Sequence, residues 1–332
     1  MSEFDAPKKV LVTGASGFFG INLVRRLCQE GYQVRTLSRA GAPPKALRDL
    51  PLEHFVGDLT NRERVFEAVR GCDIVIHMGG LISYKAKDTQ RQFTVNVIGT
   101  RYVMQACLEA RVPRVIHTSS VAAMGVPPQN TDTIADESFE YNLDGLNLNY
   151  CDSKHLAENE ALNAYDRGLN VVILCPGITF GEGDHHSHHK AIIASMEKWP
   201  FVFVPPGGVT FCDIHDVVEA HISAINHGAA GSRYAIVSAN LTFKEAAEIY
   251  LKTFDKKKPI FVVPAPVLMA VSLMLELFAY MIGKEPTFNR QTSYLSARKI
   301  FFSPKKAIDE LGFKQTPFKE TLKRLAPYYK NT

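Results

Sequence analysis

The sequence predicts an α/β fold, a Rossmann-type doubly wound parallel sheet followed by a smaller, mostly helical substrate region. Short runs of Val, Ile and Leu alternate with amphipathic stretches through the first half of the chain, as in βαβ units. The runs are nearly continuous, which is typical of parallel strands covered by helices on both faces. A glycine-rich turn joins the first run to the first amphipathic stretch.

The expected elements follow one another in a regular order. Strands are expected at residues 8–14, 32–37, 52–57, 73–78, 112–120 and 169–177. Helices are expected after the first strand, at 61–71, near 89–110 and from about residue 149. The first helix is amphipathic because Ile21, Val24 and Leu27 share one side.

The pattern loosens after Gly177. The stretches VPPGGV (204–209) and VVPAPV (262–267) separate short helices and one further strand at 233–237. We therefore expect a first domain at residues 1–177, with 210–240 returning to it, and a second, mostly helical substrate-binding region at 178–332.

Composition excludes several classes of protein. The 332 residues carry a net charge of +4 with basic residues scattered along the chain, so nothing indicates nucleic acid. Six widely spaced cysteines form no CxxC pair. The start, MSEFDAPKK, lacks the layout of a signal peptide. We expect a cytoplasmic protein with free thiols.

The segment 260–282, IFVVPAPVLMAVSLMLELFAYMI, is strongly apolar. Its part after Pro266 would form a helix of roughly 25 Å, which is short for a bilayer span. We expect a buried helix of the second region; a lid, a dimer contact or an interfacial anchor on a membrane surface are the alternatives.

Residues 13–20, TGASGFFG, lie where the first strand meets the first helix. Glycines permit a tight turn and close backbone approach, and the helix N-terminus then holds a pyrophosphate. The GxxGxxG spacing differs from the commonest dinucleotide fingerprint, GxGxxG. Its position nevertheless predicts a dinucleotide site.

The second strand ends in Ser38 and Arg39, with Lys45 nearby, where NAD enzymes usually place a carboxylate. A cation suits a ribose 2′-phosphate, so we expect NADP(H) in preference to NAD(H); the alternative is a solvated surface Arg. Asp58 could meet the adenine or cap the following helix.

Tyr150 and Lys154 are four residues apart, which on a helix stacks them on one face. A neighbouring ammonium favours phenolate, so we expect the pKa of Tyr150 to fall below about 10. The alternative is a surface Tyr and an unrelated Lys.

The chain resembles the extended short-chain dehydrogenase/reductases. The motifs TGASGFFG, GDLT, HMGG, NVIGT, HTSSVAAMG, YCDSK and CPGITFG occur in the order of that family. The resemblance is greatest to the dihydroflavonol-4-reductase and 3β-hydroxysteroid-dehydrogenase-like branch, through FCDIHDVVEAH (211–221) and FSPKKAIDELGF (302–313).

The resemblance implies a catalytic Ser120, with Ser119 the less favoured choice, a proton donor or acceptor Tyr150 and its activator Lys154. A further family Asn corresponds to Asn96. The expected cofactor-binding residues are Gly14, Ser16, Gly17, Phe18, Phe19, Gly20, Arg39, Lys45, Asp58, Leu59, Met78, Gly79, Gly80, Tyr150, Lys154, Pro176 and Gly177. The family also implies a homodimer through the helices near 89–110 and 149–167.

These residues predict an NADP(H)-dependent oxidoreductase that interconverts a ketone and a secondary alcohol on a flavanonol- or steroid-like molecule. Trp199, Phe201, Phe203 and Phe211 suggest the hydrophobic substrate.

The alternatives are a nucleotide-sugar epimerase or dehydratase with bound NAD and a non-catalytic NADP(H) sensor. The first is disfavoured because CPGITFG has no Asn and few cations follow it. An intact Ser–Tyr–Lys set argues against the second.

Residues 182–190, EGDHHSHHK, contain four histidines. We expect a substrate-side loop or solvated surface there and no metal site, because neighbouring histidines on one loop seldom close a tetrahedral site.

Overall fold

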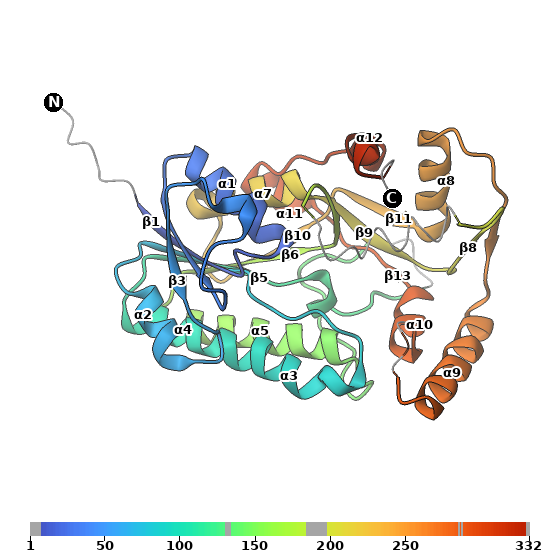
Figure 1. The fold of residues 1–332 in the computed structure, drawn as a ribbon, viewed down its shortest axis with the longest axis horizontal. Helices are drawn as coiled ribbons and strands as arrows, with labels where there is room; N and C mark the ends of the chain where they lie inside the picture. The colour runs from blue at the N-terminus through green and yellow to red at the C-terminus, as the bar shows by residue number, and fades with distance from the viewer. Residues whose placement is uncertain (1–7, 130–133, 184–197, 285, 287, 330–332) are drawn as a thin grey trace.

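The computed structural model describes residues 8–129, 134–183, 198–284, 286 and 288–329. Its main sheet has seven parallel strands in the order β10-β6-β5-β4-β1-β2-β3 (Figure 1). Their bounds are β1 Lys9–Thr13, β2 Gln33–Ser38, β3 Leu52–Val56, β4 Ile74–His77, β5 Arg114–Thr118, β6 Val171–Pro176 and β10 Arg233–Ile236. The strand order reverses beside β1, which is where open α/β sheets bind ligands. The predicted fold class is confirmed.

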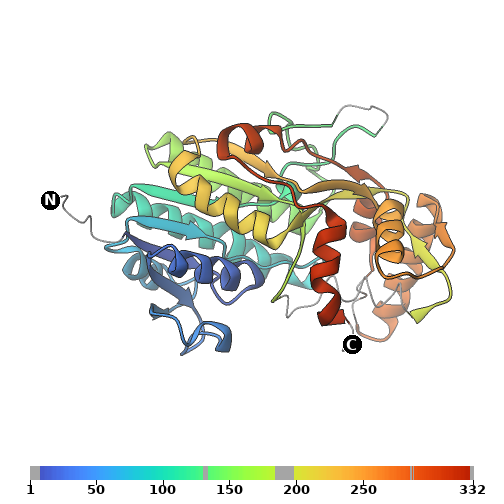
Figure 2. The same ribbon diagram turned by 90° about the horizontal axis from the view of Figure 1, so that it is seen from above.

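Helices cover both faces of this sheet (Figures 1 and 2). One face carries α1 Phe18–Gln29, α7 Ile214–His227 and α11 Lys305–Leu311. The other carries α2 Arg62–Val69, α3 Thr89–Phe93, α4 Gly99–Glu109 and α5 Asn149–Asp166. Each layer of helices closes one apolar core against the sheet, which is why the strands read as continuous apolar runs. Short 3-10 turns lie at Lys45–Leu47, Ala86–Asp88 and Val121–Ala123.

The long helix expected near residues 89–110 is not uniform. A π-helical stretch, Thr94–Ile98, separates α3 from α4. Such π-helical stretches are rare in proteins, and those that occur often lie at functional sites. It places Asn96, which is buried, under the carboxyl end of β4.

The second half of the chain contains more strands than the single one that the sequence indicated. Strands β7 Ile178–Phe180, β9 Gly208–Asp213, β11 Ala239–Thr242 and β13 Lys299–Ile300 form one sheet, and β8 Val202–Val204 pairs with β12 Ile260–Val262. Most span two to four residues, too short for an alternating pattern to appear. The helices here are α8 Phe243–Thr253, α9 Ala265–Met281, α10 Arg290–Ser296 and α12 Phe318–Tyr329.

The expectation that the segment 260–282 forms a buried helix is wrong. Helix α9 packs on α10 at the edge of the molecule (Figure 1), and only Ser272 and Ala279 of its residues are buried. Among the described residues, no helix is both long and apolar enough to cross a membrane.

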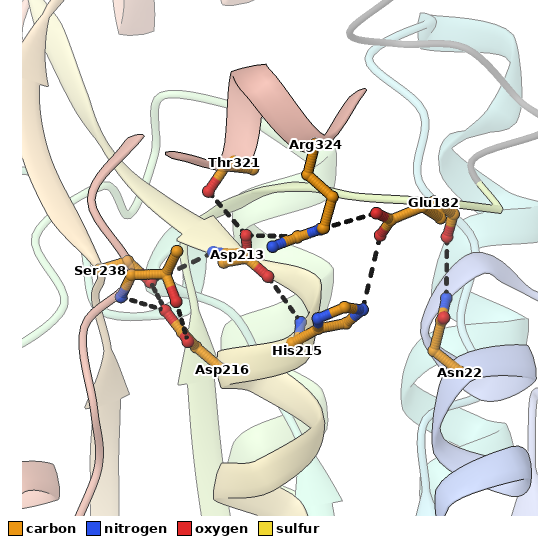
Figure 3. A network of polar contacts seen from close by, with 9 residues as sticks. Asn22, Glu182, Asp213, His215, Asp216, Ser238, Thr321 and Arg324 are labelled. Atoms are coloured by element: carbon orange, nitrogen blue, oxygen red, sulfur yellow. Dashed lines mark hydrogen bonds and ion pairs between the residues drawn. The ribbon is translucent and has the colours of Figure 1, made fainter. Parts of the chain in front are cut away.

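A polar network around the buried Asp213 attaches helix α12 to the rest of the molecule (Figure 3). Arg324 of α12 donates to Asp213 at the end of β9 (2.5 Å) and to Glu182 beyond β7 (2.6 Å). Asp213 is fully buried and also accepts from Thr321 (2.6 Å). The backbone carbonyl of Glu182 accepts from Asn22 of α1 (3.0 Å). Helix α12 therefore contacts the segments that follow β7 and β9, and through Glu182 it is linked to α1 of the first half of the chain.

Candidate active site

The turn between β1 and α1 touches the loop that follows β4. Gly14 has φ +73°, and a Cβ built there would lie 2.8 Å from Gly79 Cα and N. A Cβ at Gly20 would lie 2.3 Å from the carbonyl oxygen of Gly14. Two backbones therefore approach closely at the carboxyl edge of the sheet, as the glycine motif predicts.

The first turn of α1 faces this edge with its backbone N–H groups. The first N–H groups of a helix have no acceptor within the helix. The N-cap residue Gly17 has no side chain that could accept from them, so they are available to a ligand. The Gly17 N–H itself donates to Gly14 O (2.9 Å). Ser16 is exposed beside them, and Phe18 and Phe19 contact edge to face at 5.5 Å. This arrangement fits the pyrophosphate of a dinucleotide.

Arg39 and Asp58 lie together beyond the ends of β2 and β3. Arg39 Nε is 3.9 Å from Asp58 Oδ2, and the Arg39 side chain is 72% exposed. The other carboxylate oxygen of Asp58 accepts from the N–H and the hydroxyl of Thr60 (2.9 Å each). The helix cap is Asn61, which accepts from the Arg64 N–H. The alternative that Asp58 caps this helix is therefore wrong.

Two further groups flank this position. Ser38 Oγ is enclosed and has no hydrogen-bond partner in the described part of the chain. Lys45 is exposed at the start of a 3-10 turn. A hydroxyl without a partner and two exposed cations fit the phosphate-bearing ribose of a dinucleotide.

Small residues line the edge after β4. A Cβ at Gly79 would lie 2.5 Å from Leu59 Cδ1, and one at Gly80 would lie 3.3 Å from Asn96 Oδ1. Asn96 holds this loop by accepting from the Leu81 N–H (2.7 Å) and donating to the Leu81 carbonyl (3.0 Å). Leu59 and Asn96 thus fix the backbone of the loop, and Met78, at its start, packs against the core on the α1 side.

Ser120, Tyr150 and Lys154 converge at the carboxyl end of β5. The Ser120 hydroxyl is near enough to the Tyr150 phenol to lower its pKa, and Ser120 Oγ accepts from the Ala122 N–H (3.1 Å). Lys154, one turn along α5 from Tyr150 and 8% exposed, donates from Nζ to the Thr118 carbonyl (2.8 Å). Tyr150 is 9% exposed, so the alternative of a surface Tyr is wrong.

The neighbouring Ser119 has a different partner. Its hydroxyl donates to Glu158 Oε2 at 2.6 Å. Of the two serines, Ser120 is thus the one that faces Tyr150.

The pKa of Tyr150 shifts against the sequence-based expectation. Burial raises it to about 12, which outweighs the lowering effect of the Ser120 hydrogen bond. Burial lowers the pKa of Lys154 to about 8, against the raising effects of Cys175 and Glu158. Enclosure disfavours both charged forms, and at neutral pH it favours the protonated phenol of Tyr150.

Glu158 is a residue that the sequence analysis missed. It is 1% exposed and binds Ser119, as above, and Arg233 of β10 at 3.1 Å. It follows Lys154 by four residues, the spacing that also relates Lys154 to Tyr150, and this could have placed it on the same face of α5.

A buried histidine pair was also missed. His77 of β4 bonds Thr13 Oγ1 (2.7 Å) and Thr100 Oγ1 (2.8 Å), and its ring lies 5.3 Å from that of His117 of β5. Burial lowers the pKa of His77 to about 3, and it lowers that of His117 as well; nearby Lys154 adds to both shifts. Both rings are neutral, so no charge on them opposes the ammonium of Lys154.

Pro176 ends β6 and Gly177 follows it, yet the backbone of Gly177 is already engaged in hydrogen bonds. Its N–H donates to Ile236 O (3.3 Å), and its carbonyl accepts from Thr179 (3.1 Å). A Cβ at Gly177 would lie 2.4 Å from Thr210 O. Gly177 therefore permits β9 to cross closely.

The aromatic residues proposed as substrate contacts do not form one group. Phe211 is buried in the core of the second region with Phe180 and Phe318. Trp199 and Phe203 are 54% and 62% exposed. The histidines at 185–189 lie outside the described residues.

Comparison with known proteins gives a consistent result. Residues 10–238 match the family model described as the NAD dependent epimerase/dehydratase family. A Synechocystis protein provisionally named dihydroflavonol 4-reductase is 30% identical, over 96% of this chain and 94% of its own. Sterol demethylase protein B of Methylococcus capsulatus is 30% identical, over 80% of each chain.

Solved structures share the whole fold. The crystal structure of gox2253 is 28% identical with a TM-score of 0.84, over 98% of each chain. A UDP-glucose 4-epimerase of Thermus thermophilus, solved in complex with NAD, matches at 21% identity and a TM-score of 0.74, over 98% of this chain and 99% of its own. At that identity the likeness concerns the fold.

Proposed function

Since the chain belongs to the NAD dependent epimerase/dehydratase family, whose members are NAD(P)-dependent enzymes of alcohols and ketones, we propose that it reduces a ketone reversibly to a secondary alcohol. The convergence of Ser120, whose hydroxyl acts on the pKa of Tyr150, with Tyr150 and the buried Lys154 at the end of β5 carries the proposal. It supplies a proton donor and a second hydroxyl at one point of the sheet edge.

The chain's own residues supply the proton and hold the substrate oxygen. A bound nicotinamide supplies or accepts hydride. Tyr150, protonated because burial raises its pKa, donates to the carbonyl oxygen on which charge develops, while Ser120 donates a second hydrogen bond to that oxygen. Lys154 keeps a positive charge near the phenol. In the reverse direction the tyrosinate accepts the proton of the alcohol.

The proposed substrate is a hydrophobic, flavanonol- or steroid-like ketone. The names of the relatives support this class, since they refer to a dihydroflavonol, a sterol and, for an Arabidopsis relative 28% identical, a 3β-hydroxysteroid. Between Gly177 and Asp213 the sequence offers only Lys190 and Lys198 as cations for a nucleotide diphosphate. That disfavours the epimerase alternative.

The proposed cofactor is NADP(H). Arg39 is exposed at the end of β2, where it can turn from Asp58 to a 2′-phosphate. We expect Arg39→Ala to raise the KM for NADPH about tenfold or more, the loss of one charge-assisted contact, while the KM for NADH changes less than about twofold. An equal change for both cofactors contradicts the assignment.

The decisive experiment follows NADPH and NADH consumption with flavanonols, ketosteroids and UDP-sugars. We expect NADPH oxidation with one ketone class and a loss of about 10²–10⁴-fold in kcat for Tyr150→Phe with unchanged cofactor binding. Tyr165→Phe, at an exposed position of the same helix, is the matched control. Conversion of a UDP-sugar without net NADPH consumption overturns the proposal in favour of an epimerase; cofactor binding without any turnover indicates the sensor.

The homodimer through α3, α4 and α5, and the cytoplasmic location, stay predictions. All six cysteines are free.

A further inference from the structure

Helix α9 is turned with its polar side inward. Ser272 and Ala279 are buried, and Glu276 between them binds Arg290 of α10 through Nε at 2.6 Å and through the backbone N–H at 2.8 Å. Glu276 is the only charged residue of the helix. The helix is thus held to the protein by small and polar residues.

The rest of its surface is apolar and exposed. We call this surface, together with the neighbouring aromatic residues described below, the apolar face. Its helical members are Val267, Met269, Val271, Leu273, Met274, Leu275, Leu277, Phe278, Tyr280 and Met281, between 38% and 86% exposed. At 100° per residue they cover an arc of roughly 240°. A soluble helix normally shows the reverse arrangement, with the apolar stripe inward.

Aromatic side chains extend the apolar face beyond the helix. Phe261 of β12, 50% exposed, precedes α9 by four residues. Its ring lies 5.8 Å from that of Phe203 on the paired strand β8 and 6.4 Å from that of Phe201. Phe201 stacks on Trp199 at 6.3 Å. The exposed rings of Phe203 and Phe261 lie on paired strands, and β12 leads into α9, so these apolar side chains are not scattered singly over the surface.

Cations border the apolar face at both ends. Lys198 lies 5.8 Å from the Trp199 ring, and Lys258 donates to the Trp199 carbonyl (2.8 Å). Lys257 is exposed beside them, and exposed Lys284 follows the end of α9. Residues 252–285 contain five lysines and three carboxylates, of which Glu276 is turned inward. Lysines therefore outnumber carboxylates along this segment.

We propose that the apolar face docks this protein on the surface of an anionic lipid bilayer, with α9 lying in the interfacial layer. A wide apolar arc, aromatic rings and bordering lysines are the features of interfacial helices. A helix that packs against protein typically buries an apolar stripe of about 100°. Contact with one helix of a second copy of the chain would therefore leave much of the apolar arc of α9 exposed. It would also bring the bordering lysines of two copies near one another. The proposal is independent of the substrate and of the catalytic roles assigned above.

Trp199 provides the readout, because it is the only tryptophan of the chain. The full-length protein is titrated with vesicles of phosphatidylcholine alone and with vesicles containing about one quarter phosphatidylserine. With the anionic vesicles we expect a blue shift of Trp199 emission, quenching by brominated lipid and co-sedimentation that weakens as salt rises.

Substitutions on the apolar face test the docking itself. Leu277→Glu and Met274→Glu, both at exposed positions of α9, should each weaken binding about tenfold or more, because burying a leucine- or methionine-sized side chain contributes that much. Ile308→Glu, at an exposed position of α11, is the matched control and should bind normally. Circular dichroism confirms that each variant is folded.

Two results overturn the proposal. The first is the absence of binding to either vesicle; if sedimentation equilibrium then shows a dimer that Leu277→Glu dissociates, a second copy covers the face. The second is vesicle binding that neither α9 substitution weakens, which places the contact elsewhere.

Discussion

Gly14 lies where the turn after β1 touches the loop after β4. Its positive φ is strained for any other residue, and a Cβ would overlap the backbone of Gly79. Both effects act on the edge of the sheet that we assign to the cofactor.

We therefore expect Gly14→Ala to lower the free energy of unfolding by about 3 kcal/mol or more and to weaken NADPH binding at least about tenfold. Gly31 is the matched control, because its φ is +83° with nothing within 4 Å, so Gly31→Ala tests the backbone strain alone at about 1 kcal/mol. Urea unfolding and NADPH fluorescence measure the two effects. Equal effects of the two substitutions would exclude a role for the contact with Gly79.

The raised pKa of Tyr150 leads to a second prediction at the scale of single residues, which concerns the dependence of activity on pH. Its pKa is raised to about 12, so the tyrosinate needed for alcohol oxidation grows about tenfold per pH unit below that value. The kcat/KM for oxidation should rise through the neutral range without a plateau, while that for reduction should not depend on the deprotonation of Tyr150. A plateau in oxidation that begins below about pH 8 would show that the pKa of Tyr150 is lowered in the working enzyme.

At the scale of elements, α5 carries Tyr150, Lys154 and Glu158 on successive turns, all of them buried. Its buried face joins the carboxyl end of β5 to the edge strand β10, because Glu158 binds both Ser119 and Arg233. The helix is therefore a support of the site as well as the source of two of its residues.

We expect Glu158→Gln to lower the free energy of unfolding by about 3 kcal/mol, because Arg233 keeps a largely buried charge without its partner. Glu160 is the matched control on the same helix. It pairs with Arg101, whose side chain is 44% exposed, and Glu160→Gln should change stability by less than about 1 kcal/mol. Similar urea midpoints for the two variants would contradict the importance of the buried pair.

At the scale of the whole molecule, Arg324 joins the last helix to the two strands that lead away from the main sheet (Figure 3). Asp213 is completely buried there, and a buried carboxylate without its cation is strongly unfavourable.

We expect Arg324→Met to lower the free energy of unfolding by about 3 kcal/mol and to make α12 more sensitive to limited proteolysis. Lys323→Met, at the exposed neighbouring position, should change neither. If both variants unfold alike, the contact of Arg324 with Asp213 does not hold the last helix.

Much of the first half could be predicted because its signals are local. Apolar runs indicated the six strands from β1 to β6. The sequence motifs indicated the glycine turn and the residues Ser120, Tyr150 and Lys154, which lie at the carboxyl edge of the main sheet. The division of the chain at residue 177 stays a prediction. Short strands such as β13 have no local signal, since two residues show no alternation and only the neighbouring strand defines them.

The parallel sheet, the glycine turn and the placement of Tyr150 and Lys154 one turn apart on a helix follow from the sequence alone, because periodicity and helical spacing are properties of neighbouring residues. Tertiary packing was needed to show that burial raises the pKa of Tyr150, that Glu158 binds Arg233, and that α9 turns its apolar side outward. These depend on burial and on contacts between distant segments, and a pattern of neighbours contains neither.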